Sequence, residues 1–142
     1  MPLKNYTTEV AVDKSVEEIR KLLVNHGIRD IGLTYSEAKQ AVGLSFAITV
    51  RGQVQLFALP CRWEAVQKVL IKQKVEPRYQ TQQHAQRVAW RILKGWIENQ
   101  LALIELDMVQ THEVFLPYRK TRTGKSVFDT IDSGESPQLL LN

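Results

Sequence analysis

Basic side chains are concentrated in one part of the sequence and are the groups best suited to bind a ligand. Residues 62–94 hold eight Lys or Arg and two Glu, a charge of +6, whereas the whole chain carries +4. Such a concentration of cations is typical of proteins that bind polyanions, and an aromatic ring beside them can stack on a base. The candidate nucleic-acid-binding residues are Lys68, Lys72, Lys74, Arg78, Tyr79, Arg87, Arg91 and Lys94.

The spacing of these residues predicts that most of them lie on two helices. Lys68 and Lys72 are one helical turn apart. Steps of three, four and three residues place a second group on one face of a longer helix, before Glu98 changes the sign; this basic stripe consists of His84, Arg87, Arg91 and Lys94. We expect the basic stripe to face solvent, opposite an apolar face. The same pattern also fits the ordinary solvated faces of two amphipathic helices.

Sequence signatures of catalytic and metal sites are absent. The chain has no Gly-rich phosphate loop, no Cys-x-x-Cys and no His-x-x-x-His pair. Its three histidines are far apart in sequence. The single cysteine, Cys61, cannot form an internal disulfide and is interpreted as a small buried hydrophobe. Asp129 and Asp132 lie in a Ser- and Gly-rich segment that offers no rigid scaffold for a metal. We therefore predict a non-enzymatic protein without cofactor or metal.

The C-terminal residues form a short motif that can bind a protein. Gln138, Leu139 and Leu141 match part of the Gln-Leu-x-Leu-Phe peptide with which bacterial replication and repair proteins bind the sliding clamp. Asn142 stands where that motif has Phe. These three residues are the candidate protein-interaction site of the tail, and the alternative is that they pack back on the domain.

The composition predicts one soluble globular domain. Of 142 residues, 44% are hydrophobic and 24% are charged, which is typical of a folded domain with a buried core. No apolar run approaches the roughly 20 residues that cross a bilayer, so we expect no contact with a membrane. The first residues lack the apolar stretch of a secretory signal, which favours a cytoplasmic location.

Hydrophobic periodicity predicts an α+β fold. A strand at residues 7–12 precedes a helix with a Ser15–Glu18 capping box and a stop at Gly27. Residues 28–35, 42–50 and 54–59 read as a strand meander, and helices are expected at residues 62–75 and, capped by Thr81, to about residue 109. The expected architecture is a β-α-β-β-β antiparallel sheet with two further helices, the last long and amphipathic.

The domain is expected to end before the basic segment that follows Tyr118. Residues 1–118 form the predicted single domain, and residues 119–142 form a flexible tail that is basic and then acidic. The apolar face of the last helix, which includes Trp90, Leu93 and Ile97, is broader than one small sheet needs. This breadth favours a homodimer that is formed by contacts between the long helices.

Part of the chain resembles a family of phage proteins. The stretch from Tyr79 through Arg87-Val88-Ala89-Trp90-Arg91 to Glu105, followed by Glu113-Val114-Phe115-Leu116-Pro117-Tyr118, resembles small uncharacterised proteins of bacteriophage and prophage genomes. The resemblance extends back to Thr7 and covers about four fifths of the chain. That family has no established activity, so no residue role follows from it. The resemblance implies a phage context, in which proteins of this size commonly serve DNA replication, recombination or suppression of host defence.

Two function hypotheses follow. The first is a non-enzymatic nucleic-acid-binding accessory protein of a phage or mobile element, which contacts the phosphates of DNA or RNA with little sequence preference. The second is a protein-interaction module, an inhibitor or adaptor that binds a host protein through the apolar long helix or the tail. The element order of residues 15–75 also occurs in double-stranded RNA-binding domains, but the second helix here begins Arg62-Trp63-Glu64, without their lysine-rich start.

Overall fold

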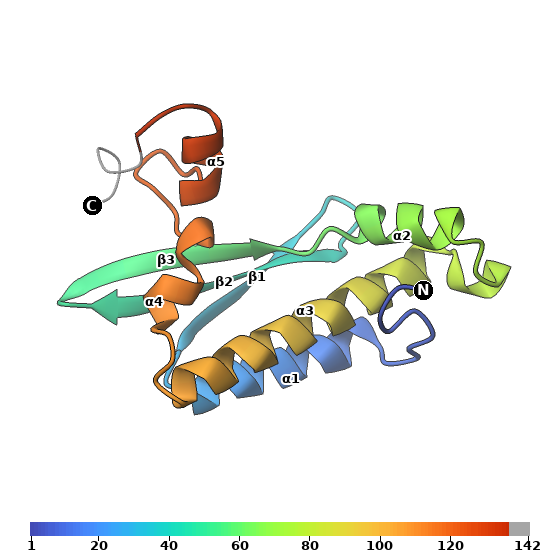
Figure 1. Ribbon diagram of the computed structural model, residues 1–142, viewed down its shortest axis with the longest axis horizontal. Helices are drawn as coiled ribbons and strands as arrows, with labels where there is room; N and C mark the ends of the chain where they lie inside the picture. Colours follow the sequence, from blue (N-terminus) through green and yellow to red (C-terminus); the bar gives the residue numbers. More distant parts are fainter. Residues whose placement is uncertain (137–142) are drawn as a thin grey trace.

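One three-stranded antiparallel sheet and the helices beside it make up the structure, so the fold is α+β (Figure 1). The computed structural model describes residues 1–136. The elements in chain order are α1 (Val12–Asn25), β1 (Asp30–Tyr35), β2 (Ala41–Val50), β3 (Gln53–Pro60), α2 (Trp63–Lys72), the 3-10 turn η1 (Pro77–Tyr79), α3 (Gln82–Glu105), α4 (Thr111–Val114), the 3-10 turn η2 (Leu116–Tyr118) and α5 (Val127–Asp132).

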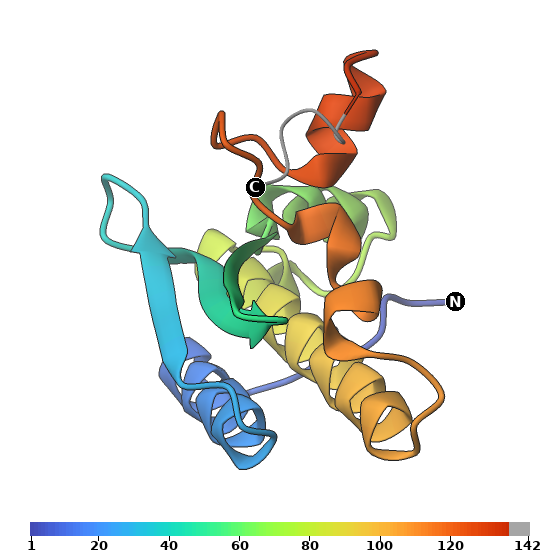
Figure 2. The same ribbon diagram turned by 90° about the vertical axis from the view of Figure 1, so that its left-hand side faces the viewer.

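The predicted strand meander is confirmed. The strands lie in the order β1-β2-β3, and all neighbours are antiparallel. Leu44 and Phe46 of β2 are buried, whereas the residues that alternate with them, Gly43, Ser45 and Ala47, are small, so one face of β2 contributes large side chains to the core. Helices α1 and α3 lie side by side against that face (Figure 2).

The predicted first strand is absent. Residues 4–7 form a turn, and α1 begins at Val12, three residues before the expected cap. Ser15 therefore lies inside the helix, fully buried, and does not cap it. The N-terminal segment contacts the start of α3 and does not form a strand. The Tyr6 carbonyl accepts a hydrogen bond from His84 Nε2 at 2.5 Å. The sheet consequently has the order α-β-β-β where β-α-β-β-β was expected.

Helix α3 is the central element of the helical layer. Its predicted cap is confirmed, because the Thr81 hydroxyl accepts from the backbone N–H of His84 at 3.1 Å. Trp90 is 1% exposed, and its indole Nε1 donates to the Ala41 carbonyl of β2 at 2.9 Å. Helix α3 also contacts both α1 and α2. Packing within one chain therefore accounts for the broad apolar face, which no longer argues for a homodimer.

Secondary structure continues beyond Tyr118, where a flexible tail was expected. Arg119 forms an antiparallel bridge with Phe57, and the backbone N–H of Lys120 donates to the Leu56 carbonyl at 2.7 Å. Ser126 then caps α5. The physical reason is that the outer edge of β3 presents backbone donors and acceptors, and Arg119 and Lys120 pair with some of them.

Aromatic side chains connect the segment around Phe115 to the core. Phe46 and Phe57 stack with ring centroids 5.4 Å apart, and the fully buried Phe115 meets Phe46 edge-on at 5.2 Å. Trp96 of α3 contacts the same Phe115 ring at 5.6 Å. Phe115 is therefore part of the core, and its ring contacts link α3 to the sheet.

We expect Trp90→Phe to lower the free energy of unfolding by about 1–3 kcal/mol, because it removes a buried hydrogen bond between α3 and the sheet. The matched control is Trp63→Phe, whose indole is half-buried and forms no hydrogen bond in the described chain. Urea unfolding of both variants measures the difference. Equal losses in the two variants would contradict the importance of the Trp90–Ala41 bond.

Candidate nucleic-acid interface

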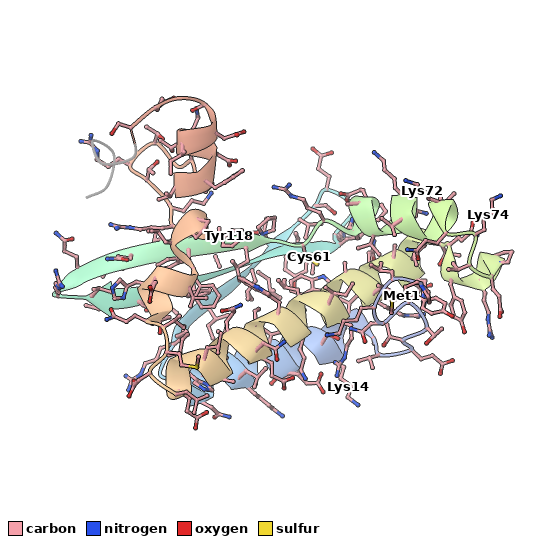
Figure 3. The ribbon with its side chains drawn as sticks, viewed as in Figure 1. Met1, Lys14, Cys61, Lys72, Lys74 and Tyr118 are labelled. Atoms are coloured by element: carbon pink, nitrogen blue, oxygen red, sulfur yellow. The ribbon has the colours of Figure 1, made fainter. Side chains whose placement is uncertain are left out.

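Helix α2 and the connector after it carry a group of exposed cations. Leu70 is fully buried, and Trp63 and Val66 are half-buried, so this side of α2 packs toward α3. The opposite side therefore faces solvent. We name the following exposed cations the α2 surface: Arg62, Lys68, Lys72, Lys74 and Arg78. Lys72 and Lys74 are seen at one end of the molecule in Figure 3.

Most charges of the α2 surface are not neutralised by the protein. Arg78 Nε lies 2.9 Å from Glu76 Oε2, and both side chains are about two-thirds exposed. Arg62, Lys68, Lys72 and Lys74 form no ion pair within residues 1–136. Four exposed cations are thus available to an anionic partner.

The ring of Tyr79 is engaged within the protein. The Arg78 guanidinium lies 4.6 Å from its centroid, and Tyr6 meets it edge-on at 5.7 Å. The His84 ring lies a further 4.9 Å away, centroid to centroid. Tyr79 therefore belongs to a small aromatic cluster between η1 and the start of α3, and its ring is less accessible to a base than the sequence suggested.

The basic stripe does not face solvent, contrary to the sequence prediction. His84 is 4% exposed and holds the Tyr6 carbonyl. Arg91 forms an ion pair with Glu18 of α1, and it also donates to the Ser15 hydroxyl at 3.2 Å. Lys94 pairs with Glu98 at 3.0 Å. The physical reason is that α1 packs along this flank of α3 and brings its own acid, which local spacing cannot reveal.

Arg87 is the remaining cation of the basic stripe. It is half-buried and lines a cavity of about 220 Å³ together with Gln83, Gln86 and the start of α1. It forms no ion pair in the described part of the chain. Figures 1 and 2 place α1 and α2 on different sides of α3. The structure therefore does not bring all eight candidate residues onto one surface.

The Arg91–Glu18 pair changes the pKa of the Glu18 carboxyl. The hydrogen bond from Arg91 lowers the pKa of the Glu18 carboxyl, against the opposing effect of burial, and the positive charge of Arg91 lowers it further. The carboxylate is therefore the stable form in the folded state. This pair contributes to folding and leaves little charge for a ligand.

Two histidines that are distant in sequence lie at one cavity. His26 and His112 line a polar cavity of about 600 Å³ with Arg29, Asp30 and Asp107. His26 Nδ1 donates to the Leu22 carbonyl at 2.8 Å, and its Nε2 is 3.9 Å from Glu105 Oε2. Among residues 1–136, no group of three or more His, Cys, Asp or Glu is arranged to hold a metal ion.

Other candidate residues take structural positions. Cys61 is 5% exposed, and burial, followed by the charge of Glu64, raises the pKa of its thiol to about 12. The interpretation of Cys61 as a buried hydrophobe is confirmed. Asp129 and Asp132 lie exposed on α5. The tail motif of Gln138, Leu139 and Leu141 lies outside the described residues.

Comparison with known proteins adds no family or relative to this description. Comparisons of the chain with protein-family models, with curated proteins and with solved structures find no match. Across residues 1–136, no helix combines the length and apolar character that crossing a membrane requires. Function must therefore be argued from the exposed charge and the cavities themselves.

We expect Arg91→Ala to lower the midpoint of thermal unfolding by a few degrees, corresponding to about 1 kcal/mol, because it breaks the partly buried pair with Glu18. Lys68→Ala, on the exposed side of α2, should leave the midpoint unchanged. The difference in unfolding midpoint between the parent protein and Arg91→Ala should shrink as pH falls through the lowered pKa of Glu18. Protonation of Glu18 removes the ion pair in the parent protein as well. Calorimetry over an acid pH series measures both midpoints. A difference between them that grows on acidification would contradict the role of the Arg91–Glu18 pair.

Proposed function

We propose that the protein is a non-enzymatic nucleic-acid-binding accessory protein of a phage or mobile element. The observation that supports this function is the α2 surface, in which four of five exposed cations have no acidic partner within residues 1–136. Phosphate groups of DNA or RNA supply the missing counter-charge, and their binding releases condensed ions from the nucleic acid.

The geometry of α2 favours contact with a phosphate backbone. Lys68 and Lys72 are separated by about 6 Å along the helix axis. Lys74 and Arg78 extend the charge into the connector, where the Arg78 side chain is held over the Tyr79 ring. Contacts of this kind fix position but do not read base edges, so binding with little sequence preference follows.

The structure changes which residues carry the proposal. Arg91 and Lys94 are held by Glu18 and Glu98, so we assign them no main role in binding. Arg62 joins the site, because it is exposed at the start of α2 and forms no ion pair with any residue from 1 to 136. The sequence contained a signal for Arg62, since it opens the basic segment immediately before the helix.

The wider setting of the proposal comes from the sequence resemblance. A phage context favours replication, recombination or anti-defence as the process served, and the cytoplasm of a bacterial host as the location. Binding alone is proposed, without a reaction, because no catalytic motif accompanies the cations.

A protein partner is the second candidate, and one observation favours it. Val69 and Ile71, on the same helix as Lys68 and Lys72, are 36% and 51% exposed. Apolar side chains among cations suit an acidic, partly apolar protein surface. A host protein bound in this way would be inhibited or recruited by α2.

Charge reversal on α2 tests the first proposal. Lys68→Glu/Lys72→Glu should weaken binding of fluorescent oligonucleotides at least tenfold and reduce the slope of log K against log salt by about 1.5. The control, Lys14→Glu/Lys21→Glu, makes the same change in net charge on exposed positions of α1. Lys14 lies across the molecule from Lys72 (Figure 3).

Fluorescence anisotropy over a salt series measures both variants. Equal weakening by the two variants would show that only net charge matters and would overturn the site. Absence of binding by the parent protein at low salt would overturn the function and leave the protein partner as the candidate.

A further inference from the structure

An apolar cavity of about 350 Å³ lies beside the α2 surface, between α2, α3, the end of β3 and η2. We name it the α2–α3 cavity. Its volume is within the range of about 300–1,000 Å³ that is typical of small-ligand sites. The residues that matter for its chemistry are Val66, Ala89, Leu93, Trp96, Tyr118 and Arg62. Figure 3 shows Tyr118 and Cys61 between the end of β3 and α3.

Two aromatic rings of the cavity are fixed in place by the core. Trp96 and Tyr118 are half-buried, with ring centroids 6.0 Å apart and planes at 74°. The buried Phe115 meets Trp96 edge-on, and Trp96 is held on the long helix α3. Aromatic side chains fixed in this way bind a planar ring without a large loss of side-chain entropy.

One cation lines the same cavity and continues its surface toward the lysines. Arg62 is exposed and has no ion pair in the part of the chain that the structure describes. It stands directly before α2, the helix that carries Lys68 and Lys72. A ligand that fills the cavity with an aromatic ring can thus place an attached phosphate at the guanidinium.

We infer that the α2–α3 cavity receives an unpaired base of single-stranded nucleic acid, with the adjoining phosphates at Arg62 and along α2. This inference rests on the proposed function and gives it a substrate class. Stacking on aromatic side chains tolerates every base, whereas a duplex must first flip a base out at a cost of a few kcal/mol. The protein should therefore prefer single strands to duplexes of equal charge.

The test compares oligonucleotides that differ only in their bases. A dT oligomer and an abasic oligomer with the same number of phosphates make equal electrostatic contacts, so their ratio of affinities isolates the base. The parent protein should bind the dT oligomer about tenfold more tightly. Tyr118→Ala should bring this ratio toward one, whereas Arg62→Ala and Lys68→Glu/Lys72→Glu should weaken both oligomers and preserve the ratio.

Each outcome separates the inference from the function on which it rests. Equal, salt-dependent binding of dT and abasic oligomers by the parent protein overturns the inference and leaves the α2 surface as a phosphate site. Absence of binding to either oligomer overturns both. A base-dependent ratio that Tyr118→Ala leaves unchanged overturns the assignment to this cavity, which then fits an apolar side chain of a protein partner. The comparison within the parent protein does not depend on the folding of any variant.

Discussion

The position of α3 against the sheet is the constraint on which the rest of the structure depends. A sheet with one apolar face must be covered, and α3 covers it while the Trp90 indole holds the Ala41 carbonyl of β2. Because α3 has α1 on one flank and α2 on the other, both helices receive their orientation from it. This one packing arrangement determines which charged side chains reach solvent and where the apolar cavity opens.

Much of the fold was predictable because its signals are local. The cap at Thr81, the meander of three strands and the left-handed stop at Gly27, whose φ is +85°, all depend on neighbouring residues. The prediction of a strand at residues 7–12 was wrong because the alternation of side chains there is weak. The backbone of the N-terminal segment bonds within turns and to His84. Ser15 and Glu18 have the spacing of a capping box, yet inside a helix the same spacing serves a partner on α3.

The candidate site was predictable only in part, for a physical reason. Periodicity places Arg87, Arg91 and Lys94 on one face of a helix, but it does not say which neighbour that face meets. The acid that holds Arg91 is 73 positions away in the chain. The exposed lysines of α2 were identified because its polar side is not covered by another described element. The α2–α3 cavity is built from four separate segments, and no local pattern announces it.

The pairing of Arg119 and Lys120 with β3 makes the two edges of the sheet unequal. Its β3 side is closed by the Arg119 bridge and the Lys120 bond, whereas β1 pairs only with β2 among the residues that the structure describes. An additional strand, from a partner or from a misassembled copy, therefore finds a longer unpaired edge at β1. The chain after Tyr118 thus covers the middle of the outer β3 edge, which makes that edge less open than β1 to pairing with another strand.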